Sequence, residues 1–396
     1  MIKFERIMTN KHLDNQATQT LFFKDLDILR FFAAIMVVIS HAFAGYCGWF
    51  GIPKLLAEQS DPQKFSFAGK IVNQLIINGS FGVDLFFMIS GFLITLILIK
   101  EKTSTGKVNI PKFFMRRAIR IWPLYYLFIM LGPLAIHLAR STASPHYLSN
   151  ILFYNNFQAI HSVDPWGYPF AHLWSICVEE HFYLVWPIII ALIPMKYLKK
   201  VLFSLFALSL CFRLFLFMQD GDPVILYLHT FARIDVLIIG ALYAVYFSEG
   251  SQKLILTKFQ RLCLYLFFLL LASFVWVYEV KTIFQVIVYK YLFCVICGIG
   301  MIYFIFSPKR LIDIPFKSFW NYLGKISFGI YLFSNAIIPV IVHQFMYRFE
   351  TKNIWLYFFL NVFLSICIAA IVYELYEKQF LKLKKYFEVV KTKRTA

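Results

Sequence analysis

Ten apolar runs constrain this chain most, because each is long enough to cross the roughly 30 Å hydrocarbon core of a membrane as a helix. Hydrophobic residues make up 60% of the 396 residues and charged residues 15%, against about 45–50% and 25% in soluble domains. One globular core cannot hide that much apolar surface. We predict an all-α membrane protein of about ten transmembrane helices, near residues 28–46, 81–99, 120–139, 173–194, 201–218, 231–247, 261–279, 283–306, 326–346 and 354–373.

Lysine and arginine are distributed unequally between alternate loops. If the N-terminus is cytoplasmic, 28 of the 39 lie in inside segments and 7 in outside segments, with the rest in or at the ends of spans. Because basic loops stay on the cytoplasmic side, we predict that both termini are cytoplasmic. The net charge of +18 then reflects topology and not a nucleic-acid partner. The predicted parts are a cytoplasmic tail at 1–24, a ten-helix domain at 25–377 and a basic cytoplasmic tail at 378–396.

The first apolar run carries ionisable residues at two depths. Asp27 and Arg30 lie at its inner end, and His41 lies in its outer third. Eleven residues of helix rise about 16 Å and return within about 20° of the same face. We therefore expect a polar stripe from the cytoplasmic interface to a deep imidazole. The alternative is that His41 only hydrogen-bonds to a neighbouring helix.

Acidic and basic residues of three other spans lie at a similar depth, toward the outer side. They are Asp84, the doublet Glu179–Glu180, Arg233 and Asp235. Charged groups in a membrane are costly and commonly functional, so we predict a polar chamber here. Adjacent helical residues point about 100° apart, so one glutamate of the doublet is expected to face a given cavity. In the structural alternative, Asp84, Arg233 and Asp235 pair with one another across helices.

Three arginines lie at the predicted cytoplasmic start of the third helix. Arg116 and Arg120 are four residues apart and Arg117 and Arg120 are three apart, so their guanidinium groups share adjoining faces. Such a group suits bidentate capture of phosphates. The alternative is an ordinary topology anchor in contact with lipid headgroups.

The cysteines give no metal motif in a suitable context. Cys294 and Cys297 form a C-x-x-C, but they lie within a long apolar run. Small hydrophobic residues of a buried helix explain this pair better than a redox or metal site. We expect no metal.

In order along the chain, these residues resemble the acyltransferase-3 family of integral-membrane O-acyltransferases. The resemblance covers nearly the whole chain. The matching blocks are LDILRFFAAIMVVISHA with Arg30 and His41, FGVDLFFMISGFLIT, the R-x-x-R of Arg117 and Arg120 in RRAIRIWPLY, HLWSICVEEHFYLVWP with Ser175, Glu179, Glu180 and Tyr183, RIDVLIIGAL, LGKISFGIYLFSNAI and YELYEKQF. Two positions depart from the family pattern: His181 replaces the usual Gln, and Ser334 stands where a His is common.

The resemblance implies transfer of an acyl group, usually acetyl from acetyl-CoA, to a hydroxyl of a cell-surface or lipid-linked saccharide. It places the protein in a bacterial inner (plasma) membrane as a multi-pass protein. The outer loop 140–172 supplies Trp166 and Tyr168 as candidate sugar contacts. The CoA phosphates would be held at the cytoplasmic face by Arg116, Arg117 and Arg120, with Arg30 as a helper.

The resemblance also implies roles in the chemistry. His41 would act as general base or as transient acyl carrier. Glu179 or Glu180 would orient its imidazole or stabilise its charge. The remaining polar residues are expected either to bind substrate or to be structural: Asp84, Ser175, Tyr183, Arg233 and Asp235.

Two other classes of function compete with an enzyme. A proton-coupled transporter or flippase for an envelope precursor would use His41 and the carboxylates as a proton relay. Transporters favour midplane sites in repeated halves, whereas this chain shows no repeat and carries its arginines opposite its acids. A non-catalytic scaffold subunit leaves the Arg and His placement unexplained. Label transfer from acetyl-CoA to surface polysaccharide distinguishes these classes.

Overall fold

The structure is a computed structural model. It describes residues 24–50, 78–165, 167–219, 222–249 and 316–389, with Ile76 and several single residues between 257 and 300. Within these ranges every regular element is a helix, which confirms the predicted all-α membrane class. The predicted spans at 261–279 and 283–306 lie mostly outside the described residues, as do most of the N-terminal tail and residues 390–396.

Eight of the ten predicted spans have a counterpart in the described ranges. Seven helical segments are long and apolar enough to cross a membrane, and an eighth span is a bent pair whose two helices differ in direction by 58°. The count of ten and the cytoplasmic termini stay predictions. The seven segments contain α2 (Lys24–Trp49), α4 (Phe81–Thr105), α5 (Ile110–Met130) with α6 (Gly132–Ala139), α9 (Trp174–Leu192), α10 (Met195–Gln219), α11 (Pro223–Leu228) with α12 (Thr230–Ser248), and α18 (Ile354–Val372); the bent pair is α16 (Ser327–Phe333) and α17 (Ile337–Arg348).

A tight turn joins α4 to α5 and sets where α5 begins. Gly106 follows α4 with φ of 75°, a left-handed conformation that glycine adopts readily. Asn109 then caps α5, because its side chain accepts a hydrogen bond from the Lys112 N–H. The helix therefore starts at Ile110, earlier than the predicted span at 120–139. Its arginines consequently lie two to three turns inside the helix and not at its first turn.

Glycines allow the central helices to pack backbone against backbone. A Cβ added to Gly91 of α4 would lie 2.0 Å from the Leu237 carbonyl oxygen of α12. A Cβ added to Gly240 of α12 would lie 2.1 Å from the Met88 carbonyl oxygen of α4. Gly82 lies equally close to the backbone of α2. Small residues at such contacts are typical of membrane helix packing, where close approach supplies the van der Waals attraction.

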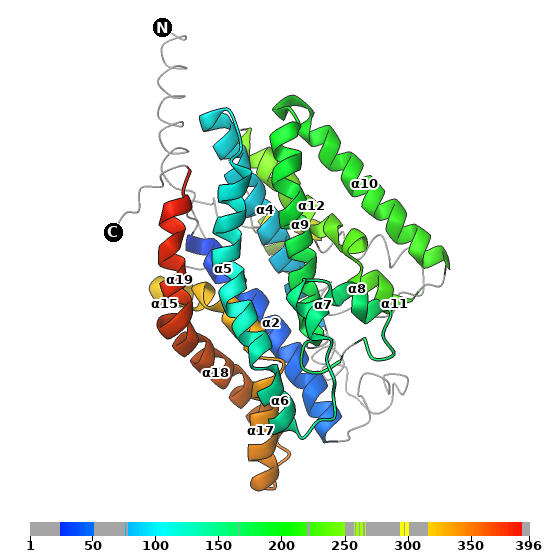
Figure 1. Ribbon diagram of the computed structural model, residues 1–396, viewed down its shortest axis with the longest axis vertical. Coiled ribbons are helices and arrows are strands. Elements are labelled where there is room, and N and C mark those ends of the chain that lie inside the picture. Colours follow the sequence, from blue (N-terminus) through cyan, green and yellow to red (C-terminus); the bar gives the residue numbers. More distant parts are fainter. Residues whose placement is uncertain are drawn as a thin grey trace.

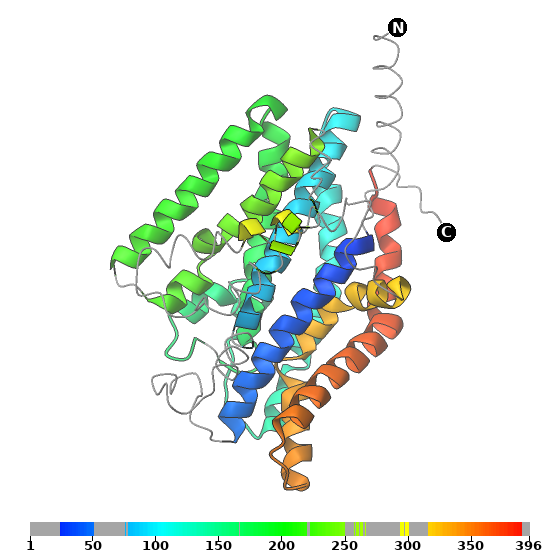
Figure 2. The ribbon, with the colours of Figure 1, turned by 180° about the vertical axis from the view of Figure 1, so that it is seen from behind.

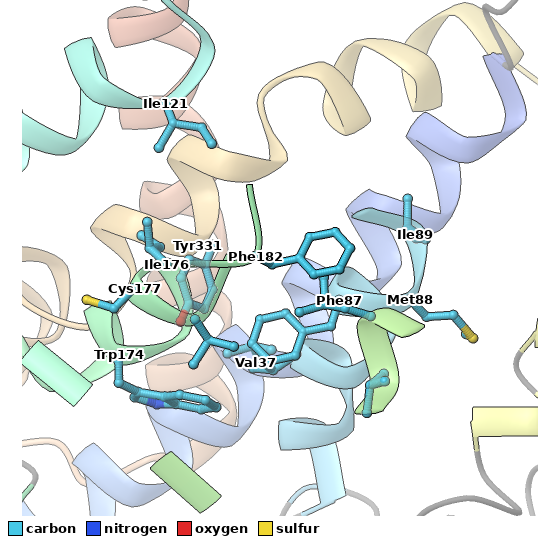
Figure 3. Packing of buried hydrophobic residues seen from close by; sticks show 14 of the residues in the cluster. Val37, Phe87, Met88, Ile89, Ile121, Trp174, Ile176, Cys177, Phe182 and Tyr331 are labelled. Atoms are coloured by element: carbon cyan, nitrogen blue, oxygen red, sulfur yellow. The ribbon is translucent and has the colours of Figure 1, made fainter. Parts of the chain in front are cut away.

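Large apolar side chains fill the space around this contact. Figure 3 shows Phe87 of α4, Trp174 and Phe182 of α9 and Tyr331 of α16 converging on one part of the core. Each of these four side chains is buried. The polar residues described below are therefore held by packed aromatic neighbours.

The helices form one bundle in which α2 is central. Helix α2 packs against α4 on one side and against α15 (Lys317–Lys325), α16 and α18 on the other, as seen in Figure 2. The α4–α5 turn lies at one end of the molecule, and α6 and α17 lie at the opposite end (Figure 1). Helix α10 leans away from the bundle and contacts it mainly through α12, leaving much of its apolar surface exposed to lipid.

The segments after α18 and before α9 both contain helical turns. After α18 the chain continues through a π-helical turn at Tyr373–Glu377 into α19 (Lys378–Leu383), which packs beside α5. The long loop at 140–172 contains α7 (Tyr147–Ile151), α8 (Asn155–Ile160) and the 3₁₀ turn η3 (Ala171–Leu173). Trp166, a candidate sugar contact, lies outside the described residues.

We expect Gly91→Ala and Gly240→Ala each to destabilise the protein by about 1–3 kcal/mol or more, because overpacking forces α4 and α12 apart. Gly48→Ala is the matched control, since no atom lies within 4 Å of a Cβ added there. The measurement is the thermal midpoint of the detergent-solubilised chain by size-exclusion recovery. Equal midpoints for all three variants would contradict the close α4–α12 contact.

Candidate active site

A cavity of about 80 Å³ lies at the centre of the bundle and brings basic and acidic residues together. We call it the arginine cavity. It is lined from α2, α4, α5, α9 and α16 by the polar residues Arg30, Ser90, Arg117, Arg120, Ser175, Glu179, Tyr183, Ser327 and Tyr331. The sequence placed the arginines and the acids at opposite surfaces. They meet in one cavity, with Arg117 and Arg120 lying two to three turns into α5 and Glu179 lying in the second turn of α9.

Glu179 is the glutamate of the doublet that lines this cavity. Its Oε1 accepts a 2.6 Å hydrogen bond from Ser90 Oγ, and Tyr183 OH donates in turn to Ser90 Oγ at 3.2 Å. Glu180 points elsewhere, and its Oε2 accepts a 3.2 Å bond from Trp122 Nε1. The expected divergence of the two carboxylates is present, and Glu179 is the member inside the cavity.

The arginines of the basic cluster separate into two environments. Arg117 lies with its guanidinium 5.9 Å from the Tyr183 ring centre, and its Nε has no hydrogen-bond partner in the described part of the chain. Arg120 contacts Glu377 at 3.4 Å. Arg116 instead is buried outside the cavity, where it donates to Glu101 Oε2 at 2.9 Å and to the Phe387 carbonyl oxygen at 2.9 Å. The expected trio is thus reduced to a pair.

Arg30 replaces Arg116 as the third guanidinium of the cavity. It lines the arginine cavity from the start of α2 and lies within electrostatic reach of Glu179. Its Nη1 is 3.9 Å from Asp27 Oδ1 on the preceding turn. Three positively charged side chains from two helices therefore surround one carboxylate, which leaves the cavity with a net positive character.

His41 lies further along α2 and meets a second histidine. Its ring centre is 6.3 Å from that of His172, and its Nδ1 is buried without a hydrogen-bond partner among the described residues. No contact among those residues joins His41 to Glu179 or Glu180, so the structure does not bring the expected base and orienter together. The His172 Nε2 lies 3.0 Å from the Leu332 carbonyl oxygen, which fixes the orientation of that ring.

Ser175 and Tyr331 connect the histidines to the arginine cavity. Tyr331 OH donates to the His172 carbonyl oxygen at 2.7 Å, and Ser175 Oγ lies 2.7 Å from Tyr331 OH. Both hydroxyls also line the arginine cavity. A row of polar groups thus runs from the guanidinium groups and Glu179 past Ser175 and Tyr331 to the backbone carbonyl of His172, whose ring lies beside His41.

Sequence reasoning missed three members of this row, His172, Ser90 and Tyr331. His172 was detectable, because it lies three residues before Ser175 and seven before Glu179 and so shares their helical face. Ser90 is a single hydroxyl in an apolar run beside Gly91, and nothing local distinguishes it. Tyr331 comes from a distant helix and is recognisable only from the fold.

Asp84, Arg233 and Asp235 lie outside the arginine cavity in a buried network. Arg233 Nη2 contacts Asp84 Oδ1 at 3.0 Å, with both side chains almost fully buried. The Arg233 guanidinium also lies over the ring of Tyr227 at 4.9 Å. Asp235 lies 4.0 Å from Arg213 of α10. Asp84 and Arg233 thus pair as in the structural alternative, whereas the ion pair of Asp235 is with Arg213, which that alternative did not include.

Two further expectations concern His181 and metals. His181, which replaces the usual Gln, has its Nδ1 2.9 Å from Thr230 Oγ1 and so ties α9 to α12. Among the described residues no group of three His, Cys, Asp or Glu side chains is placed to hold a metal ion. Cys297 of the C-x-x-C lies outside the described residues.

The fold and the site together define a polytopic helical membrane protein with a buried, positively charged cavity next to a histidine pair. A family model described as an acyltransferase domain matches residues 23–374. The chain therefore belongs to this acyltransferase family, as its sequence motifs indicated. No solved structure gives a significant match.

Several bacterial proteins are similar to the chain. SACOL0978 of Staphylococcus aureus (strain COL), provisionally named an O-acetyltransferase, is 26% identical over 78% of this chain and 54% of its own length. The peptidoglycan O-acetyltransferase OatA of Listeria monocytogenes is 29% identical over 70% of this chain and 47% of its own. The O-acetyltransferase OatA of Staphylococcus aureus (strain NCTC 8325) is 29% identical over 52% and 37%. The chain spans about half the length of these curated relatives.

We expect the Asp84–Arg233 pair to act on stability. Asp84→Leu or Arg233→Met alone strands a buried charge and costs about 3–5 kcal/mol, whereas replacing both can be close to neutral. The measurement is the thermal midpoint of the two single variants and of the double variant in detergent. A double variant less stable than either single variant would contradict the pairing.

Proposed function

We propose that the protein is a membrane O-acetyltransferase that moves an acetyl group from cytoplasmic acetyl-CoA to a hydroxyl of an envelope saccharide. The observation that carries this is the arginine cavity, in which three guanidinium groups open onto a polar row that ends at His41 and His172. Membership of the acyltransferase family supports the reaction class. The proposed location is the bacterial inner (plasma) membrane.

The donor would enter from the side of the arginines. Arg30, Arg117 and Arg120 carry fixed positive charge that suits the phosphates of CoA. Arg117 has an unpartnered Nε in the described part of the chain, so it has a donor to offer. A cavity of about 80 Å³ is well below the roughly 300–1,000 Å³ of ordinary ligand pockets. The nucleotide therefore stays at the mouth, and only the thin thioester arm reaches inward.

His41 would take the proton from the acceptor hydroxyl. The hydroxyl oxygen then forms a new C–O bond to the acyl carbon, the C–S bond breaks, and the proton passes to the CoA thiolate. In the second form of the proposal, the acyl group rests on His41 before it reaches the acceptor. His172 lies beside His41 and keeps a fixed orientation through Leu332, so it can steer the base in either form.

Glu179 has a different part from the one its position in the sequence suggested. Its carboxylate accepts a hydrogen bond from Ser90 and lies among the arginines, not against His41. We infer that it holds Ser90 and Tyr183 in place and balances the guanidinium charge until the donor phosphates arrive. Glu180, bound to Trp122, then has a structural role.

The acceptor is proposed from relatives alone. One similar protein is named as a peptidoglycan O-acetyltransferase, so peptidoglycan is one candidate. Lipid-linked saccharides and lipopolysaccharide are the other candidates, because each presents hydroxyls on the outer side of a membrane. The partners implied are membrane lipid, acyl-CoA and a saccharide.

A proton-coupled transporter is the second candidate, and one observation favours it. Helices α16 and α17 form a broken span with a 58° bend, a feature that transporters use at binding sites. The break lies next to Tyr331, which belongs to the polar row. Transfer of labelled acetyl groups separates the candidates, since a transporter moves its cargo without forming an ester.

We expect Arg117→Ala and Arg120→Ala to raise the KM for acetyl-CoA about tenfold or more. A hydrogen bond to a charged group contributes about 1.5–3 kcal/mol, and 1.4 kcal/mol corresponds to a factor of ten. Arg116→Ala is the matched comparison: its KM stays unchanged, while stability falls because Glu101 loses its partner. Initial rates of CoA release by proteoliposomes measure these values. An unchanged KM in Arg117→Ala would leave the arginines as topology anchors.

We expect His41→Ala to reduce acetyl transfer about 10²–10⁴-fold, the usual contribution of a general acid–base group. The assay follows label from acetyl-CoA into alkali-labile esters of the envelope. His343→Ala is the control, because His343 stacks on Trp49 with ring centres 4.5 Å apart and does not line the arginine cavity. Full transfer by His41→Ala would remove this residue from the mechanism.

A further inference from the structure

A second cavity, of about 240 Å³, lies in the long loop between α6 and α9. We call it the loop cavity. Its walls come from the segment before α7, from α7 and α8, and from the stretch that leads into η3. The polar residues that line it are Ser144, His146, Asn150, Asn155, Gln158, Ser162, Asp164 and Tyr168. It is three times as large as the arginine cavity and shares none of its lining residues.

The lining of the loop cavity is chemically selective. It offers amides, hydroxyls, one imidazole (His146) and one carboxylate (Asp164), and none of its described lining residues is Lys or Arg. An anionic ligand would meet the Asp164 carboxylate without the guanidinium or ammonium groups that usually hold phosphates. An uncharged polyol, by contrast, finds both acceptors and donors, and the rings of Tyr168 and Phe170 supply apolar surface for its C–H groups.

Two amide side chains in the lining have polar atoms without a hydrogen-bond partner among the described residues. Asn150 is 1% exposed, and its Oδ1 has no hydrogen-bond partner within the described residues, although its Nδ2 donates to the His146 carbonyl oxygen at 2.9 Å. The half-buried amide of Gln158 makes no hydrogen bond within that part of the chain. Because the Asn150 Oδ1 has almost no accessible surface, Gln158 is the amide that a ligand in the cavity can meet.

The cavity is pre-formed by hydrogen bonds from outside the loop. Tyr168 OH donates to the Ala135 carbonyl oxygen at 3.0 Å and lies 3.3 Å from that of Ala336. Burial raises the pKa of the Tyr168 hydroxyl to about 12, so it stays a donor at physiological pH. Tyr125 OH of α5 holds the Asn150 carbonyl oxygen at 2.7 Å. The loop is therefore fastened to α5, α6 and the α16–α17 break.

The loop cavity and the polar row share one wall. Ala171 of η3 lines the loop cavity. The next residue is His172, whose ring faces His41, and Ser175 one turn later lines the arginine cavity. One short segment thus separates a cavity lined by three arginines from one lined by no Lys or Arg in the described part of the chain, with the histidine pair between them.

We propose that the loop cavity is the acceptor subsite and binds one uncharged sugar unit of the saccharide that is to be acylated. The proposal rests on the proposed function and adds the place and the chemical class of the second substrate. Its volume of about 240 Å³ lies just below the roughly 300–1,000 Å³ of ordinary ligand pockets, which suits one small ligand unit. The sugar would present a hydroxyl across η3 to His41.

The first test measures binding without catalysis. The probe is the pool of neutral oligosaccharides released from the envelope of the producing cells and freed of esters by mild alkali. Saturation-transfer NMR with the full chain in nanodiscs should show binding to wild type. Binding should fall at least fivefold in Ala143→Phe, which fills the cavity, and in Gln158→Ala, which removes an unpaired amide. Gln219→Ala, at the end of α10, is the matched control. No binding to wild type, or equal binding to all variants, overturns the proposal.

The second test separates this inference from the proposed function. Membranes receive labelled acetyl-CoA, and label in envelope esters is compared with CoA release in the absence of acceptor. We expect Ala143→Phe and Gln158→Ala to lose ester label at least fivefold and to keep the acceptor-independent CoA release. Label equal to wild type in both variants overturns the acceptor subsite. If wild type binds the oligosaccharides but neither wild type nor any variant forms labelled esters, the acyltransferase proposal is overturned and the saccharide site is retained.

Discussion

The cost of placing charge in a low-dielectric bundle governs this structure. Each buried ionisable group needs a partner, because an unpaired charge in hydrocarbon costs several kcal/mol. Arg233 meets Asp84, Arg213 meets Asp235 and Arg116 meets Glu101. These pairs fasten α4 to α12, α10 to α12 and α4 to α5. The charged groups that are less completely paired lie in the arginine cavity. Arginines and carboxylates thus stabilise the bundle in some places and line the candidate site in another.

Much of the fold followed from hydropathy, and the functional residues followed from motif order. The apolar runs located eight spans that the structure describes, and Arg30, Arg117, Arg120, Ser175, Glu179 and Tyr183 all line one cavity. The depth of the arginines did not follow. Residues 110–119 are less apolar than those that follow, so hydropathy predicts a span that begins at 120. In the structure, Asn109 and Pro111 begin the helix at Ile110. The capping signal at Asn109 therefore sets where α5 begins and how many turns precede its three arginines. Hydropathy alone hides this start.

Contacts between distant helices decide two features that the sequence did not predict: which arginines line the cavity, and which residue His41 meets. Arg116 and Arg117 are adjacent, yet one faces Glu101 and the other faces the cavity, because they lie about 100° apart on the helix. The choice between them depends on α4 and on the C-terminal segment at Phe387. The approach of His41 to His172 of η3 likewise depends on how α2 crosses α4. No local pattern contains that crossing, since it is set by packing at glycines such as Gly82.

The two cavities explain why a transferase of this kind would keep its substrates apart. An activated thioester reacts with water as well as with a hydroxyl, so the acyl carbon must be shielded until the acceptor is in place. The arginine cavity is small and lined by three arginines, and the loop cavity is larger and has no Lys or Arg in its described lining. The two linings therefore suit different ligands. The segment from Ala171 to Ser175 contributes to both cavities and carries His172, whose ring centre is 6.3 Å from that of His41, so under this proposal the base His41 is the group that both substrates need to reach.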